Sequence, residues 1–265
     1  MTTYSERRLE LNGVEIALYE AWQGEPLLFL HGAGTLTGFD SLLPLAEHFR
    51  LIVPHHPGFG DSADDVAITS VHDYERHYLD LLDVLEIGSF TLVGHSMGGW
   101  IAATLAISQG SRISELVLAA PWGLNVPEHP TVDSFSIPDA EFAGYLPADP
   151  SVFAGKAPDP PTPEFLADRY REQTSAARVL WRHTYDPGLA RWLHRIHAPT
   201  LLLWGALDRV IPAGQLPVWR ALLADADELI LPGVGHLLFD ESERSAAAIV
   251  EHAQGRVVRA AAAAG

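Results

Sequence analysis

The sequence predicts an α/β fold in which a mostly parallel sheet is flanked by helices and interrupted by a helical insertion. Short apolar runs alternate with helical patterns over residues 6–120, and the alternation resumes over residues 199–254. Such alternation is typical of parallel sheets that helices cover on both faces. Prolines concentrate between these two segments, at residues 121–190, where they interrupt any further strand.

The first segment begins with a predicted hairpin around Asn12 and Gly13. A buried strand in "PLLFLHG", a helix near residues 39–49 and a strand in "RLIVP" follow. Residues 71–87 place apolar side chains on one face of a helix. The segment ends with an expected strand at 89–94, a helix at 97–109 and a strand at 115–120.

The insertion contains one clear helical pattern, "TPEFLADRYREQTSAARVLWRHTY", with Thr162 as the expected N-cap and Pro163 in the first turn. After it, we expect strands at 199–205 and 227–233 and helices near 213–224 and 241–254. The prediction is therefore a core formed by residues 1–122 and 191–265, interrupted by a lid at residues 123–190.

The composition excludes several classes of function. The chain of 265 residues has 17 Lys and Arg against 34 Asp and Glu, and its formal charge of -17 repels nucleic acids and anionic membrane surfaces. It has no cysteine, which excludes a cysteine nucleophile and thiolate metal sites. The N-terminus is polar and no apolar run reaches the roughly 18 residues of a membrane span, so we expect a cytoplasmic protein. No residue pattern demands an oligomer, and a monomer or a homodimer is expected.

The stretch "LVGHSMGGW" places Ser96 at the corner between a predicted strand and a predicted helix. Gly94 and Gly98 give the backbone clearance around this corner, because glycine tolerates close approach and positive φ. The form Gly-x-Ser-x-Gly in this context indicates a nucleophile elbow, which exposes a serine hydroxyl at the end of a strand.

A serine hydroxyl needs a base that takes its proton and an acid that orients the base. His236 in "LPGVGHLLFDE" follows the last predicted strand, and Asp208 in "LLLWGALDRVIP" follows the strand before it. The chain order Ser96, Asp208, His236 is the order expected for this architecture. An acid after the strand at 115–120 is the alternative, but no carboxylate occurs there before Glu128.

The oxyanion that forms on an attacked carbonyl needs hydrogen-bond donors, and backbone N–H groups at a helix N-terminus suit this role. Met97, directly after the serine, supplies one N–H. In "FLHGAGT" the N–H of Ala33, with Gly34 as the alternative, is the expected second donor. His31 is expected to brace this loop by hydrogen bonding.

Five motifs in order, "HGAG", "HHPGFGDS", "GHSMGG", "GALDRVIP" and "GVGHLLF", resemble the α/β-hydrolase superfamily over residues 25–122 and 195–254. The resemblance implies an eight-stranded, mostly parallel sheet, a Ser-His-Asp triad and no cofactor. One position departs from it. Where many relatives have Asp before Pro-Gly-x-Gly, this chain has His55, which changes the hydrogen bonding of that turn. His194 and His197 have no evident third ligand, so no metal site is expected.

Ser96 as the nucleophile predicts acyl chemistry, in particular hydrolysis of a small, largely apolar carboxylic ester through an acyl-enzyme. Three alternatives stay open: a lactone, enol-lactone or carbon–carbon bond (β-diketone) hydrolase; a cofactor-free lyase or oxygenase; and a ligand receptor on the same fold. The expected partner is a small-molecule substrate. The residues expected to bind it are Gly32, Gly34, His95, Trp122, Phe142, Tyr145 and Trp181.

Overall fold

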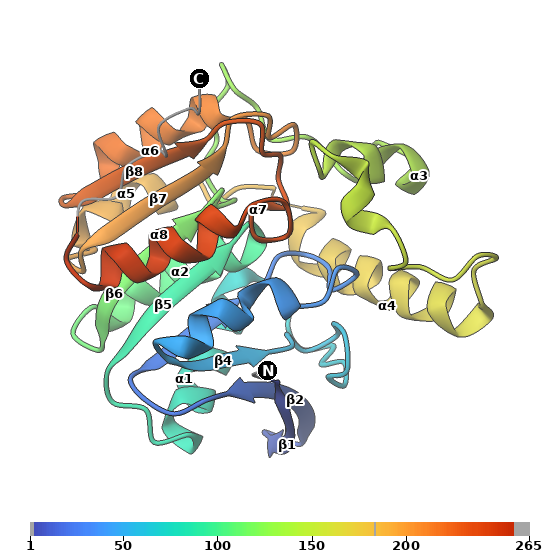
Figure 1. Ribbon diagram of the computed structural model, residues 1–265, viewed down its shortest axis with the longest axis horizontal. Helices are drawn as coiled ribbons and strands as arrows, with labels where there is room; N and C mark the ends of the chain where they lie inside the picture. The colour runs from blue at the N-terminus through green and yellow to red at the C-terminus, as the bar shows by residue number, and fades with distance from the viewer. Residues whose placement is uncertain (1–2, 183, 257–265) are drawn as a thin grey trace.

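The computed structural model describes residues 3–182 and 184–256, and these residues form one sheet of eight strands (Figure 1). The strands are β1 (Ser5–Leu11), β2 (Val14–Ala21), β3 (Pro26–Leu30), β4 (Arg50–Pro54), β5 (Phe90–His95), β6 (Ile113–Ala119), β7 (Thr200–Gly205) and β8 (Ala226–Leu231). Their spatial order is β1-β2-β4-β3-β5-β6-β7-β8. The β1–β2 and β2–β4 pairs are antiparallel and the other pairs are parallel. The predicted mostly parallel eight-stranded sheet is confirmed.

Helices cover both faces of this sheet, as predicted (Figure 1). Helices α1 (Val71–Val84) and α2 (Met97–Gln109) pack on each other on one face. The 3₁₀ helix η1 (Asp40–Glu47) and helices α7 (Leu238–Glu241) and α8 (Glu243–Ala253) lie on the other. Between β7 and β8 in the chain, η5 (Ala213–Gln215) leads into α6 (Leu216–Leu222), which packs on both of these strands.

Three helices differ in detail from the predicted ones. The helix expected near residues 39–49 is a 3₁₀ helix that contains Pro44, whose ring nitrogen cannot donate a helical hydrogen bond. Helix α1 ends at Val84, before the expected residue 87, because Glu86 turns into the left-handed region at φ 54°. The last helix, expected near residues 241–254, begins at Glu243, because Ser242 is extended and caps α8 through its side chain, and the short helix α7 before it was not predicted.

The insertion lies between β6 and β7, and in the described residues it adds no strand to the sheet. Its helices are α3 (Asp139–Phe142), η2 (Ala143–Tyr145), η3 (Pro150–Phe153), α4 (Pro163–Leu180), α5 (Leu189–Trp192) and η4 (Leu193–Arg195). The Thr162 side chain accepts the N–H of Phe165 at 3.2 Å, which confirms the predicted cap of α4. Helices α3 and α4 project beyond one edge of the core (Figure 1).

The division into a core and a lid at residues 123–190 stays a prediction. Residues 1–2 and 257–265 of the predicted core and His183 of the predicted lid lie outside the described residues. Within the described part of the chain, none of the helices has the length and apolar character that a membrane crossing requires.

Two glycines let α2 approach the centre of the sheet. A Cβ atom at Gly98 would meet the carbonyl oxygens of Leu30 and His31 at the end of β3. A Cβ atom at Gly94 would meet the Gly98 carbonyl and the Ala102 side chain of α2. Any larger side chain at either position therefore forces strand and helix apart.

We expect Gly98→Ala to lower the free energy of unfolding by about 1–3 kcal/mol, the usual cost of overpacking a close-packed interior. Gly88→Ala is the matched control, because a Cβ atom at Gly88 would meet nothing within 4 Å. Urea unfolding of both variants and the wild type measures the difference. Equal stability of the two variants would contradict this account of the corner.

Candidate active site

Ser96 occupies the tight corner between β5 and α2 that the sequence predicted. Its φ and ψ are 56° and -118°, a strained combination for a residue with a Cβ atom. Two backbone hydrogen bonds hold it there: Ser96 N–H donates to Ala119 at 3.0 Å, and Trp122 N–H donates to the Ser96 carbonyl at 2.9 Å. The hydroxyl thereby stands at the carboxyl end of the sheet.

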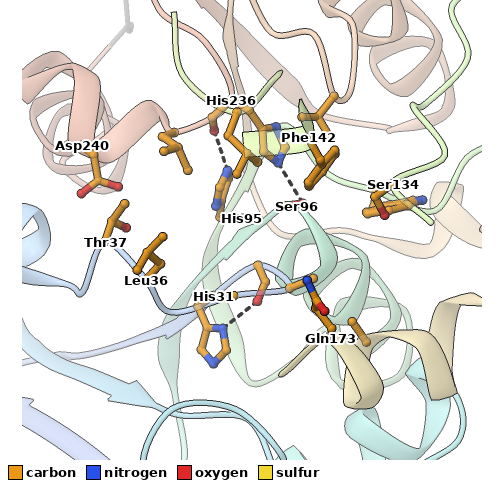
Figure 2. A pocket seen from close by; sticks show the side chains of 18 of the residues that line it. His31, Leu36, Thr37, His95, Ser96, Ser134, Phe142, Gln173, His236 and Asp240 are labelled. Atoms are coloured by element: carbon orange, nitrogen blue, oxygen red, sulfur yellow. Dashed lines mark hydrogen bonds between the residues drawn. The ribbon is translucent and has the colours of Figure 1, made fainter. Parts of the chain in front are cut away.

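Asp208, His236 and Ser96 form one chain of hydrogen bonds (Figure 2 shows its Ser96 end). His236 Nδ1 lies 2.8 Å from Asp208 Oδ2, and His236 Nε2 lies 3.0 Å from Ser96 Oγ. With Nδ1–H donating to the carboxylate, Nε2 is the free acceptor for the serine proton. All three residues are buried, so water competes little for these bonds.

Separate contacts fix the acid and the base. Asp208 Oδ1 accepts the N–H groups of Val210 and Ile211 at 2.8 and 2.9 Å, which leaves Oδ2 for the histidine. His236 N–H donates to the carbonyl of Leu146, in the insertion, at 2.7 Å. The His236 carbonyl accepts from His95 Nε2 at 2.8 Å (Figure 2). Burial lowers the pKa of His95 to about 3, so this ring is a neutral donor at neutral pH.

The predicted oxyanion donors lie on the two elements expected to carry them. Met97 is the first residue of α2, and Ala33 lies in the loop after β3. In the described residues, neither N–H donates to a protein acceptor. Gly32 brings this loop against the nucleophile, since a Cβ atom there would lie 3.2 Å from Ser96 Cβ. The role of the Met97 and Ala33 N–H groups as oxyanion donors stays a prediction.

His31 braces the loop, as expected from the sequence. Its Nε2 accepts the N–H of His56 at 2.9 Å, so the proton sits on Nδ1, which donates to the Gly32 carbonyl at 2.7 Å. His56 in turn lies 2.8 Å from the His31 carbonyl through Nε2 and also contacts the Tyr78 hydroxyl. Burial lowers the pKa of His31 well below its ordinary value and that of His56 to about 3.

His55, the position at which this chain departs from the family pattern, forms hydrogen bonds within its turn. Its Nδ1 accepts the N–H of Asp61 at 2.8 Å, and its carbonyl accepts the hydroxyl of Ser62. The ring lies tilted on Tyr19, and burial lowers the pKa of His55 to about 4. The turn is therefore closed by a neutral imidazole.

A cavity of about 420 Å³ opens beside Ser96 (Figure 2). Six of the seven predicted substrate contacts line it: Gly32, Gly34, His95, Trp122, Phe142 and Trp181. Tyr145 is elsewhere, since it stacks on Phe142 with 6.4 Å between ring centroids and lies under the Arg209 guanidinium. The prediction for Tyr145 rested on its aromatic type alone, which does not fix the side of the lid that it faces.

Other lining residues were not predicted as substrate contacts. Most are apolar: Leu36, Phe135, Ile137, Leu146, Phe153, Leu180 and Val210. Ser134, Gln173 and Asp240 add polar groups (Figure 2). Aromatic residues in the insertion were the sequence signal for a pocket of this kind, but no motif marks the individual positions.

The comparisons identify the family of the chain. A model of the alpha/beta hydrolase family matches residues 27–251, so the chain belongs to this family. The chain is 26% identical to the 2-hydroxy-6-oxo-6-(2'-aminophenyl)hexa-2,4-dienoic acid hydrolase of Metapseudomonas resinovorans, over 89% of this chain and 86% of that protein.

Two solved structures have the same fold. A serine hydrolase involved in carbazole degradation has a TM-score of 0.78 and 25% identity, covering 96% of this chain and 100% of that one. A thermophilic esterase from Thermogutta terrifontis has a TM-score of 0.74 at 22% identity, with the same coverage, and this likeness concerns the fold alone. The chain is thus an α/β serine hydrolase with a triad of hydrogen-bonded Ser96, His236 and Asp208.

The buried neutral histidines predict a loss of stability in acid. His31, His55, His56 and His95 have pKa values lowered by burial, so between about pH 6.5 and their native pKa values the unfolded chain binds protons that the folded chain does not. The stability that these neutral histidines contribute is fully present above about pH 6.5. As the pH falls from 6.5 to the native pKa of a histidine, that histidine is expected to reduce the free energy of unfolding by about 1.4 kcal/mol per pH unit.

Urea unfolding at pH 7.5, 6.0 and 5.0 measures this slope. His56→Asn is expected to make the slope shallower, whereas His72→Asn, at a half-exposed histidine of α1, is the control that leaves it unchanged. A free energy of unfolding that stays constant from pH 7.5 to 5.0 would show that these histidines are not held neutral.

Proposed function

We propose that the protein hydrolyses small, uncharged, largely apolar carboxylic esters through an acyl-enzyme on Ser96. The observation that carries the proposal is the hydrogen-bonded chain from Asp208 to Ser96 at the wall of an apolar cavity. The hydrogen-bonded side chains supply an activated nucleophile. The cavity supplies the surface that holds an acyl or alcohol group beside Ser96.

The proposed cycle uses His236 twice. Ser96 Oγ attacks the ester carbonyl carbon while His236 Nε2 takes the hydroxyl proton, and the N–H groups of Met97 and Ala33 bind the oxyanion. The bond to the alcohol oxygen then breaks, and His236 gives its proton to the leaving alcohol. Water next attacks the acyl-enzyme with His236 as base, which releases the carboxylic acid and restores Ser96.

The charges around the cavity favour an uncharged ester over an acidic substrate. Of the described residues that line the cavity, none is Lys or Arg, and one, Asp240, is an acid. His31 and His95 also line it, but burial lowers the pKa of both, so neither supplies a positive charge at neutral pH. Lys156 is not among the described lining residues, and its ammonium donates to the Thr37 carbonyl at 2.6 Å. A substrate carboxylate in the cavity would therefore lose its hydration without a cation in the wall to pair with.

Carbon–carbon bond hydrolysis is the second candidate function. It is favoured by the 26% identity to an enzyme named as a hydrolase of a dienoic acid, which spans most of both chains. The same triad serves both reactions, so the candidates differ in the substrate and not in the nucleophile. The absence of a basic group among the described lining residues is the reason to place the ester first.

Ser96→Ala is expected to reduce the turnover of p-nitrophenyl esters by about 10⁴-fold or more, because it removes the nucleophile of the acyl-enzyme route. Ser134→Ala is the matched control, since Ser134 lines the same cavity outside the hydrogen-bonded triad. Release of p-nitrophenol by wild type and both variants, with circular dichroism to verify folding, gives the comparison.

Mass spectrometry after treatment with a fluorophosphonate completes this test. Wild type and Ser134→Ala are expected to gain one adduct, located at Ser96, and Ser96→Ala none. An adduct at Ser96 without ester turnover would move the assignment to carbon–carbon or lactone hydrolysis. Undiminished ester turnover by folded Ser96→Ala would refute the mechanism.

The charge argument makes a prediction about acyl chains. We expect p-nitrophenyl hexanoate to be hydrolysed with a kcat/KM at least about tenfold above that of the mono-p-nitrophenyl ester of adipic acid, whose chain ends in a carboxylate. Asp240→Asn is expected to lower the ratio of these two kcat/KM values, because it removes an acid from the cavity wall beside Thr37 (Figure 2).

Asp227→Asn removes an exposed carboxylate of β8 and is the control that leaves the ratio unchanged. A wild-type preference for the adipate ester would contradict the proposed substrate class and would favour an acidic substrate.

A further inference from the structure

Glu172 of α4 is a buried acid that the cycle above does not use. Glu172 is 3% exposed, and its carboxylate accepts hydrogen bonds from two loops of the core. Oε1 accepts from the Thr35 hydroxyl at 2.5 Å and from Gly60 N–H at 2.9 Å. Oε2 lies 3.3 Å from Thr35 N and pairs with the Arg169 guanidinium at 2.7 Å. The contacts with Thr35 and Gly60 join the insertion to the core, whereas Arg169 belongs to α4 itself.

Thr35 lies two residues after Ala33, the predicted oxyanion donor, in the loop after β3. Gly32 and Gly34 flank Ala33, so the local chain has little stiffness of its own. The loop is fixed from both sides instead. The His31 ring holds the Gly32 carbonyl on one side, and Glu172 holds both donors of Thr35 on the other. A Cβ atom at Gly34 would lie 3.8 Å from Glu172 Oε2, which places the carboxylate directly against the loop.

We infer that Glu172 is a positioning residue that orients the Ala33 N–H for the oxyanion. The inference rests on the proposed function. Glu172 touches neither Ser96 nor His236, and acts through Thr35 on the backbone between Gly32 and Thr35. Its neighbour Gln173 lines the cavity (Figure 2), so the same turn of α4 contacts both the substrate space and the oxyanion loop. The Glu172 contacts that dock α4 on the core are then the same contacts that position the oxyanion donor.

A second ion pair of α4 provides a control. Arg178 forms an ion pair with Asp64 through both guanidinium Nη atoms, and it lies in the last turn of the same helix. This pair ties α4 to the core without touching Thr35. Loss of helix docking in general is therefore separable from loss of the Glu172 contacts.

The test compares Glu172→Ala, Glu172→Gln and Arg178→Gln on an ester that the wild type hydrolyses. Glu172→Ala is expected to lower kcat by about 10- to 100-fold, less than the full loss of an oxyanion donor, with KM changed less than threefold. Glu172→Gln keeps one acceptor oxygen and is expected to fall between wild type and Glu172→Ala. Arg178→Gln is expected to keep kcat within twofold of wild type.

A trifluoromethyl ketone reports on the oxyanion hole directly. Ser96 Oγ adds to its carbonyl carbon and passes its proton to His236, and the carbonyl oxygen becomes the bound oxyanion. The inhibition constant is expected to rise in Glu172→Ala by the same factor as kcat/KM falls, and to stay unchanged in Arg178→Gln. An unchanged inhibition constant in both Glu172 variants would overturn the inference.

Hydrogen exchange of the peptide covering residues 32–38 tests the positioning without any substrate. Faster exchange in the Glu172 variants than in Arg178→Gln supports the inference, and equal exchange overturns it. If Glu172→Ala does not fold, Glu172→Gln carries the same comparison. A wild type that hydrolyses no ester and gains no adduct at Ser96 refutes the proposed function instead, and the exchange result then decides this inference alone.

Discussion

The close approach of α2 to β3 and β5 is the constraint on which the site depends. Only glycine fits at Gly94 and Gly98, because any Cβ atom there would meet backbone of the opposing element. This contact forces Ser96 to a φ of 56°, and the backbone bond from Ser96 N–H to Ala119 holds it in place. The same contact sets the N-terminus of α2 beside the loop after β3. Nucleophile and predicted oxyanion donors are thus consequences of one packing requirement.

The rest of the triad depends on the parallel order of the sheet. Strands β5, β6, β7 and β8 are neighbours in sequence and in space, so their carboxyl ends bring Ser96, Asp208 and His236 to one edge. The insertion then completes the arrangement, because Leu146 accepts the N–H of His236 and Glu172 binds the loop that carries Ala33. Core and insertion are separate along the chain but share the hydrogen bonds of the site.

Whether a feature of the fold or the site could be predicted from the sequence depends on how far apart in the chain the interacting residues are. The strands are short apolar runs, and the residues of the triad follow strands in a fixed chain order, so local pattern and motif order were sufficient for both. Glu172 has no such signal, since its partners Thr35 and Gly60 lie more than a hundred residues away and belong to no motif that requires an acid. Tyr145 lies outside the cavity lining for a related reason: aromatic type indicates burial but not which side of a lid the ring faces. The end of α1 was missed because Glu86, not a glycine, adopts the left-handed conformation that terminates the helix.

The family does not decide the substrate, because the proteins similar to this chain include a hydrolase of a dienoic acid and an esterase. The sheet, the corner and the triad of this chain supply a nucleophile for any accessible carbonyl. We propose that the substrate is selected in the cavity, whose described walls come from both the core and the insertion and are mostly apolar. His31 and His95, which burial keeps neutral, and the acid Asp240 are among the ionisable residues that line it. An anionic substrate would lose its hydration in these walls, whereas an uncharged ester loses little hydration and gains the apolar wall. We therefore infer that acidic substrates are disfavoured in the site, where the described walls carry no Lys or Arg, and at long range, by the formal charge of -17.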